Sequence, residues 1–277
     1  MENFLYRPEI QSAVLPFVIA LVISLVLRKL TATAWPWALL AAFSVSALLI
    51  NGFTLTPLTG TRKIILLIGA ALFAAALLPG VLTRLRLQRP FTALFCLLAL
   101  AWVFWAVVAR MQTLQIAMIA AAAVAFALTL QLSFERVTAN PARLHGAGLS
   151  LLLGVGLSAT AAASALLGQL ALALAAASGG AYLAGVITGA GGKSKQLVVT
   201  LPYVLAPLLL GVASVLFARM PWYALIPLAF IPLAVSLVPD KAESRFMRAL
   251  LASLPGLVIA LATSFWVWKS SGSASGY

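Results

Sequence analysis

The sequence has very little charge and few residues that bind metals. Only 8% of the 277 residues are charged, and there are five Asp and Glu, one His and one Cys. Apolar residues make up 64% of the chain, whereas a soluble domain has about 45–50% apolar and about 25% charged residues. The composition excludes a soluble globular protein and indicates an integral membrane protein.

The carboxylates all lie at or beyond the ends of the apolar stretches. They are Glu2, Glu9, Glu135, Asp240 and Glu243. Proton- and ion-coupled carriers usually depend on Asp, Glu or His at membrane depth. Such carriers are therefore disfavoured, although backbone carbonyls at broken helices can also bind cations.

The sequence also lacks the residues of a cofactor or catalytic site. With one Cys (Cys96) and one His (His145), the chain cannot supply the ligand sets that zinc, haem or copper sites require. We expect no cofactor, and we expect His145 to be a solvated residue of a loop at 134–146, with a pH-sensitive contact as the alternative. No Gly-x-Ser-x-Gly elbow is present, so an enzyme is the least supported class.

The apolar residues form about ten stretches, each near the roughly 20 residues that a membrane-spanning helix requires. They predict an all-α, polytopic fold in which residues 1–269 form one transmembrane domain and residues 270–277 a flexible tail. The stretch from 146 to 192 is expected to form two helices with a turn near Gln169, and nine spans are the alternative. The predicted spans are 10–27, 35–51, 64–83, 91–109, 114–132, 147–168, 171–190, 197–218, 222–238 and 248–267.

Positive charges are distributed unequally between the connections. Alternate connections carry twelve of the eighteen Lys and Arg residues: Arg28, Lys29, Arg84, Arg86, Arg89, Arg136, Arg143, Lys193, Lys195, Lys241, Arg245 and Arg248. Because cytoplasmic loops hold the excess of Lys and Arg, both termini are predicted to lie outside, in the periplasm if the membrane is a bacterial inner membrane. The clusters suit anionic lipids at the cytoplasmic face, and no nucleic acid partner is expected.

Small residues recur at every fourth position in two rows. The first small-residue row is Ser150, Gly154, Ser158 and Ala162, and the second is Ala181, Gly185 and Gly189. Such rows allow helix backbones to approach closely, which predicts a tight helix pair. Two alternatives are a docking face for another subunit and a narrow polar pathway lined by Ser158, Thr160, Ser164, Ser178, Tyr182 and Thr188.

Proline is frequent in the last three predicted spans. The predicted helix breaks are Pro202, Pro207, Pro227, Pro232 and Pro255. An interior proline leaves a backbone carbonyl without its helical partner. Broken helices mark the sites of many transporters, and they also occur in membrane helices that transport nothing.

Three cations are expected at the outer rim. Arg62, Lys63 and Arg110 are candidates for contacts with anionic headgroups, and ordinary anchoring at the interface is the alternative. Residues 1–145 and 146–269 would hold five spans each, and a weak match of Arg89-Pro90 with Met220-Pro221 is compatible with an inverted repeat.

These features favour a transporter or permease for a small solute or a lipid-like molecule. The predicted spans leave no room for a soluble domain, and the prolines and scattered hydroxyl groups lie inside the membrane. The alternative is a non-catalytic structural subunit or assembly factor of a larger membrane complex. In that case the small-residue rows would bind other membrane subunits or a second copy of the chain.

Overall fold

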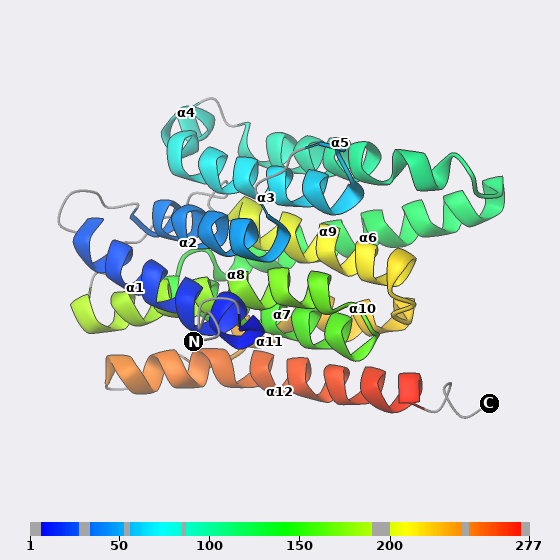
Figure 1. Ribbon diagram of the computed structural model, residues 1–277. Coiled ribbons are helices and arrows are strands. Elements are labelled where there is room, and N and C mark those ends of the chain that lie inside the picture. Colours follow the sequence, from blue (N-terminus) through cyan, green and yellow to red (C-terminus); the bar gives the residue numbers. More distant parts are fainter. Residues whose placement is uncertain are drawn as a thin grey trace.

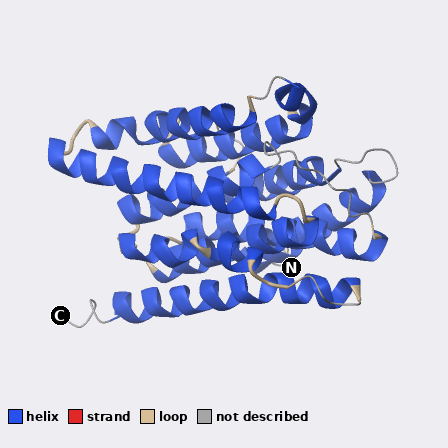
Figure 2. Cartoon of the chain, turned by 180° about the vertical axis from the view of Figure 1, so that it is seen from behind, coloured by secondary structure: helices blue, strands red, loops and turns tan. Residues whose placement is uncertain are grey.

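The computed structural model describes residues 7–27, 34–52, 56–84, 87–189, 200–239 and 244–272. This part of the chain is helical, without any strand (Figures 1 and 2). A π-helical turn, Ile10–Val14, leads into the first α-helix. The α-helices are α1 (Leu15–Leu27), α2 (Ala34–Asn51), α3 (Gly60–Leu77), α4 (Pro79–Arg84), α5 (Gln88–Val108), α6 (Thr113–Val137), α7 (Pro141–Ala161), α8 (Ala165–Thr188), α9 (Leu201–Phe217), α10 (Leu225–Ala229), α11 (Ile231–Ser236) and α12 (Arg245–Gly272), with a 3-10 turn at Trp222–Ala224.

Seven helices of the described chain are long and apolar enough to cross a membrane. They are Ile10–Leu27, Gly60–Leu77, Gln88–Val108, Thr113–Val137, Pro141–Ala161, Ala165–Thr188 and Arg245–Ser271, and three shorter apolar segments are Trp35–Asn51, Leu201–Phe217 and Trp222–Ser236. Large apolar side chains such as Trp105, Leu114 and Phe265 are more than half exposed, as expected of surfaces that face lipid. The all-helical prediction is confirmed, and the helices are consistent with an integral membrane protein.

Helices α7 and α8 form the centre of the bundle. Of the residues in the apolar, membrane-length stretch of each helix, 72% are buried in α7 and 61% in α8, compared with 17% in α6. Helix α7 packs mainly on α8 and α12, whereas α8 also covers α1 and α2. In Figure 1, α12 runs along one side of the bundle and α5 lies on the opposite side.

Small residues account for the close approach of α7 and α12. A Cβ atom added at Gly256 would lie 2.7 Å from Cβ of Ser150, and one added at Gly154 would lie 3.0 Å from Cβ of Ala260. Ser150 Oγ also donates a hydrogen bond of 3.3 Å to the carbonyl of Ser253. The first small-residue row therefore packs within the chain, and α12 covers the face that the subunit interpretation would have offered to a partner.

The turn between α7 and α8 lies at residues 162–164. The prediction of two helices in this stretch is confirmed, but the predicted position of the turn near Gln169 is wrong, because Gln169 lies within α8. Ala163 closes α7 in the left-handed region, with a φ of 72°, and the N–H of Ser164 donates to the carbonyl of Ala159. Glycine usually occupies this position. Because the residue here is alanine, the sequence does not indicate a turn at this point.

The helix ends gather at two ends of the bundle. At one, which we call the His145 end, α7, α9 and α12 begin and α6 and α8 finish; at the other, the Arg62 end, α3 begins and α5, α9 and α12 finish (Figure 1). At the His145 end, Arg89 and Glu135 join α5 to α6 through an ion pair of 2.6 Å. Arg143 donates hydrogen bonds to the carbonyl of Ser236, the last residue of α11, and to that of Val238 just after it.

Several predictions concern residues outside the described ranges. They include the positive charges at 28, 29, 86, 193, 195 and 241 and the last part of the tail, 273–277. The tail was expected to begin at Ser270, but α12 continues to Gly272. Ser270 Oγ donates to the carbonyl of Val267, a bond that serine hydroxyls commonly make within a helix.

Candidate functional site

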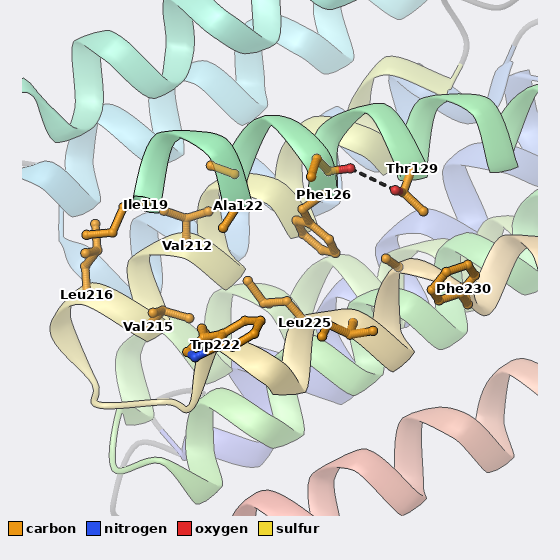
Figure 3. A pocket seen from close by; sticks show the side chains of 14 residues that line it. Ile119, Ala122, Phe126, Thr129, Val212, Val215, Leu216, Trp222, Leu225 and Phe230 are labelled. Carbon is orange, nitrogen blue, oxygen red and sulfur yellow. Dashed lines mark hydrogen bonds between the residues drawn. The ribbon is translucent and has the colours of Figure 1, made fainter. Parts of the chain in front are cut away.

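An apolar groove lies between α6, α9 and α10, and we call it the lateral groove. It has a volume of about 320 Å³, within the range of about 300–1,000 Å³ typical of ligand pockets. Figure 3 shows Ile119, Ala122 and Phe126 of α6 opposite Val212 and other residues of α9 and the segment after it. Three residues that line the groove, Trp222, Ile226 and Phe230, are 61%, 48% and 47% exposed, so the groove opens on the outer surface of the bundle.

A break in the predicted ninth span forms one wall of this groove. Helix α10 ends at Ala229 and α11 begins at Ile231, so Phe230 interrupts the segment. Pro227 lies within α10 and Pro232 in the first turn of α11, and neither has an N–H to donate. The N–H of Phe230 instead donates to the carbonyl of Pro227 over 3.2 Å. The segment that contains Pro227 and Pro232 is therefore interrupted, and the interruption faces the groove through Phe230.

The chemistry of the lateral groove is almost entirely apolar. Its one side-chain hydroxyl belongs to Thr129, and this hydroxyl donates a hydrogen bond of 2.8 Å to the carbonyl of Ala125 (Figure 3). No titratable side chain lines the described groove. It therefore suits a hydrocarbon chain or another weakly polar molecule, and it offers no group for acid–base catalysis.

The other predicted helix breaks behave differently. Pro202 is the second residue of α9. An N–H at this position would make no hydrogen bond within the helix, so the proline is compatible with the start of the helix and does not interrupt it. Pro207 lies inside α9 and Pro255 inside α12, and both helices continue past them.

The six residues of the predicted polar pathway are spread along α7 and α8 from one end of the bundle to the other. Ser158 Oγ lies 3.3 Å from Ser264 Oγ of α12, and Ser164 precedes the first residue of α8. Thr160 and Thr188 donate to carbonyls of their own helices, near opposite ends of the bundle. Tyr182 donates a 2.9 Å hydrogen bond to the carbonyl of Ala249. The contacts of Ser158 and Tyr182 join helices, and a solute pathway along these residues stays a prediction.

The three candidate headgroup cations lie at the Arg62 end. Arg62 Nη1 donates to the carbonyl of Pro57 over 2.6 Å. Lys63 Nζ donates to the carbonyl of Trp102 and lies 5.4 Å from the centroid of that ring. Arg110 is exposed in the turn between α5 and α6. Lys63 is thus directed toward α5, whereas the neighbouring Arg62 bonds to the chain before α3.

The expectation that His145 is a solvated loop residue is wrong. Helix α7 begins at Pro141, and Asn140 caps it by accepting hydrogen bonds from the N–H groups of residues 142 and 143. His145 is therefore in the first turns of the helix and only 4% exposed. An Asn-Pro pair is a typical helix start. This pair in the sequence was sufficient to predict that the helix begins at Pro141 and not at residue 147.

His145 belongs to a buried aromatic cluster that the sequence did not predict. Its Nδ1 lies 3.0 Å from the hydroxyl of Tyr203. Trp35 and Phe134 both stack on the Tyr203 ring, with centroids at 5.4 and 5.9 Å. Ser178 Oγ is buried near the Tyr203 hydroxyl. The cluster joins α2, α6, α7 and α9, and we interpret it as a polar part of the core.

Neither metal ligands nor known relatives point to another site. Within the described ranges, no three His, Cys, Asp or Glu residues lie close enough together to hold a metal ion. No protein-family model, curated protein or solved structure matches the chain.

Proposed function

We propose that this protein is a transporter or permease for a lipid-like, weakly polar molecule. The observation that carries the proposal is the lateral groove, which is apolar, opens on the outer surface of the bundle and is bounded by the broken segment α10–α11. A molecule that dissolves in the bilayer would reach such a site from the side. A charged solute would find no partner there.

The broken segment also provides a means of movement. Helices α10 and α11 are five and six residues long, and the turn at Phe230 separates them. A short interrupted segment can tilt at its break, because fewer helical hydrogen bonds resist the change than in a continuous helix. Tilting of α10 against α6 and α9 would change the width of the groove and expose its contents to either leaflet.

The proposal includes a membrane arrangement. The ten apolar segments each cross the bilayer, with the His145 end in the cytoplasm and both termini in the periplasm of a bacterial inner membrane. The excess of Lys and Arg on the connections at the His145 end supports this orientation. Anionic lipids at the cytoplasmic face would be the partners of those charges.

Filling the lateral groove should slow transport. Ala122 lines the groove on α6, and Ala122→Phe would place a ring in it. We expect the protein in vesicles to move a fluorescent lipid with an uncharged headgroup between leaflets, measured by quenching from outside. Ala122→Phe should slow this movement by about tenfold, which corresponds to about 1.4 kcal/mol.

Ala121→Phe is the matched control for this experiment. Ala121 is the preceding residue of the same helix, is also exposed and does not line the groove. It should move the probe at the wild-type rate. Equal rates in protein-containing and empty vesicles would refute transport of this class of molecule. A stoichiometric protein partner purified with the chain would then favour the subunit alternative, although α12 already covers the first small-residue row.

A further inference from the structure

A second groove lies between α2 and α3 near the Arg62 end, and we call it the α2–α3 groove. Its volume is about 420 Å³. Asn51, the last residue of α2, and Arg62, in the first turn of α3, lie at one end of it. Phe43 lies eight residues before Asn51 on α2, so the groove extends about 12 Å along the helix at about 1.5 Å per residue.

Polar and apolar groups are separated along this groove. The guanidinium of Arg62 and the amide of Asn51 are at the end of the helices, together with Gly52. Further from that end, the walls are formed mainly by Phe43, Ala47, Leu48, Ile65 and Leu66. A charged end followed by an apolar channel has the polarity of a membrane lipid, with its headgroup at the interface and its chain in the hydrocarbon region.

Glycine keeps the apolar part of the groove open. Gly69 lines it on α3, and a Cβ atom added there would meet no heavy atom within 4 Å. This differs from Gly154 and Gly256, where another helix occupies the space beside the glycine. At Gly69 the space is left to whatever lies in the groove.

The charge at the mouth of the groove selects the headgroup. Arg62 is positively charged, its Nη1 is held by the carbonyl of Pro57, and no Asp or Glu lines the groove. Arginine binds phosphate oxygens through charge-assisted hydrogen bonds. Lys63, the next residue in the sequence, is directed to Trp102 on α5. Arg62 is therefore the positively charged residue that lines this groove.

We propose that the α2–α3 groove binds one anionic phospholipid, with its phosphate at Arg62 and Asn51 and one acyl chain beside Gly69. The site lies on different helices from the lateral groove and does not depend on the proposed transport. The occupant is a lipid and not a free phosphate ion, because the apolar walls contribute binding only to a chain.

Lipid binding to the purified full chain in neutral detergent tests this proposal. The probes are a fluorescent phosphatidylglycerol and the matching phosphatidylcholine. Arg62→Gln should remove the preference for phosphatidylglycerol, and Gly69→Leu should weaken binding of both lipids by about tenfold, because its side chain takes the space of the acyl chain. Inorganic phosphate should not displace the phosphatidylglycerol probe.

Ala70→Leu is the control for Gly69→Leu, since Ala70 is the next residue of α3, exposed and outside the groove. It should bind both lipids as the wild type does. Ser44→Phe would fill the groove from α2 and is the second variant if Gly69→Leu does not fold. An unchanged lipid preference in Arg62→Gln, wild-type binding by a folded groove-filling variant, or displacement by inorganic phosphate would each overturn the proposal.

Discussion

Gly180→Ala is expected to destabilise the protein strongly. A Cβ atom at Gly180 would collide with the backbone carbonyl oxygen of Phe17 and lie 3.0 Å from the backbone nitrogen of Leu21. Backbone atoms cannot rotate away as the end of a side chain can, so α1 and α8 must separate. Overpacking in a close-packed interior costs about 1–3 kcal/mol, and we expect the upper part of this range. The midpoint of thermal unfolding in mild detergent measures the effect.

The adjacent glycine supplies the control. At Gly179 the nearest atoms to an added Cβ are Leu149 Cδ1 at 3.6 Å and ring carbons of Phe17 at 3.7 Å, which is ordinary contact. Gly179→Ala should therefore match or exceed the wild-type stability, since alanine is favoured over glycine in helices by about 0.8–1.0 kcal/mol. Similar melting of the two variants would show that α1 does not pack on α8 as described.

Replacing Tyr203 should also have a large effect. Its ring is 1% exposed and stacks on Trp35 and Phe134, so Tyr203→Ala should cost about 3–5 kcal/mol through the cavity that it leaves. Tyr203→Phe keeps the ring and removes the hydroxyl bonded to His145. Removing one side of this buried hydrogen bond should cost about 1–3 kcal/mol. Unfolding by denaturant, followed through tryptophan fluorescence, can rank the variants.

Tyr223→Phe is the comparison for the hydroxyl effect. Tyr223 is half-buried at the Arg62 end and packs on Trp266, with ring centroids at 4.7 Å. Loss of its hydroxyl should leave stability near the wild-type value. If Tyr203→Phe were equally neutral, the His145–Tyr203 bond would contribute nothing to the fold.

The prolines illustrate how far the sequence leads toward the candidate site. Pro227 and Pro232 are five residues apart, and the segment between them is interrupted at Phe230. Pro202 was predicted to break a helix for the same reason, but it lies in the first turn of α9. The difference lies in where the helix starts, which depends on packing against neighbours and not on the proline itself. That this break borders a groove is a property of α6 and α9, which are distant in sequence.

Helical class and membrane character were determined by the sequence alone, because they depend on composition and on the length of apolar stretches. The close packing of the first small-residue row followed from spacing in the same way. The partner of that row, α12, the burial of His145 against Tyr203, and both grooves were decided only by tertiary structure. Each depends on which distant helices lie side by side. In a chain that is 64% apolar, many helix faces are chemically alike, so shape complementarity selects the neighbours.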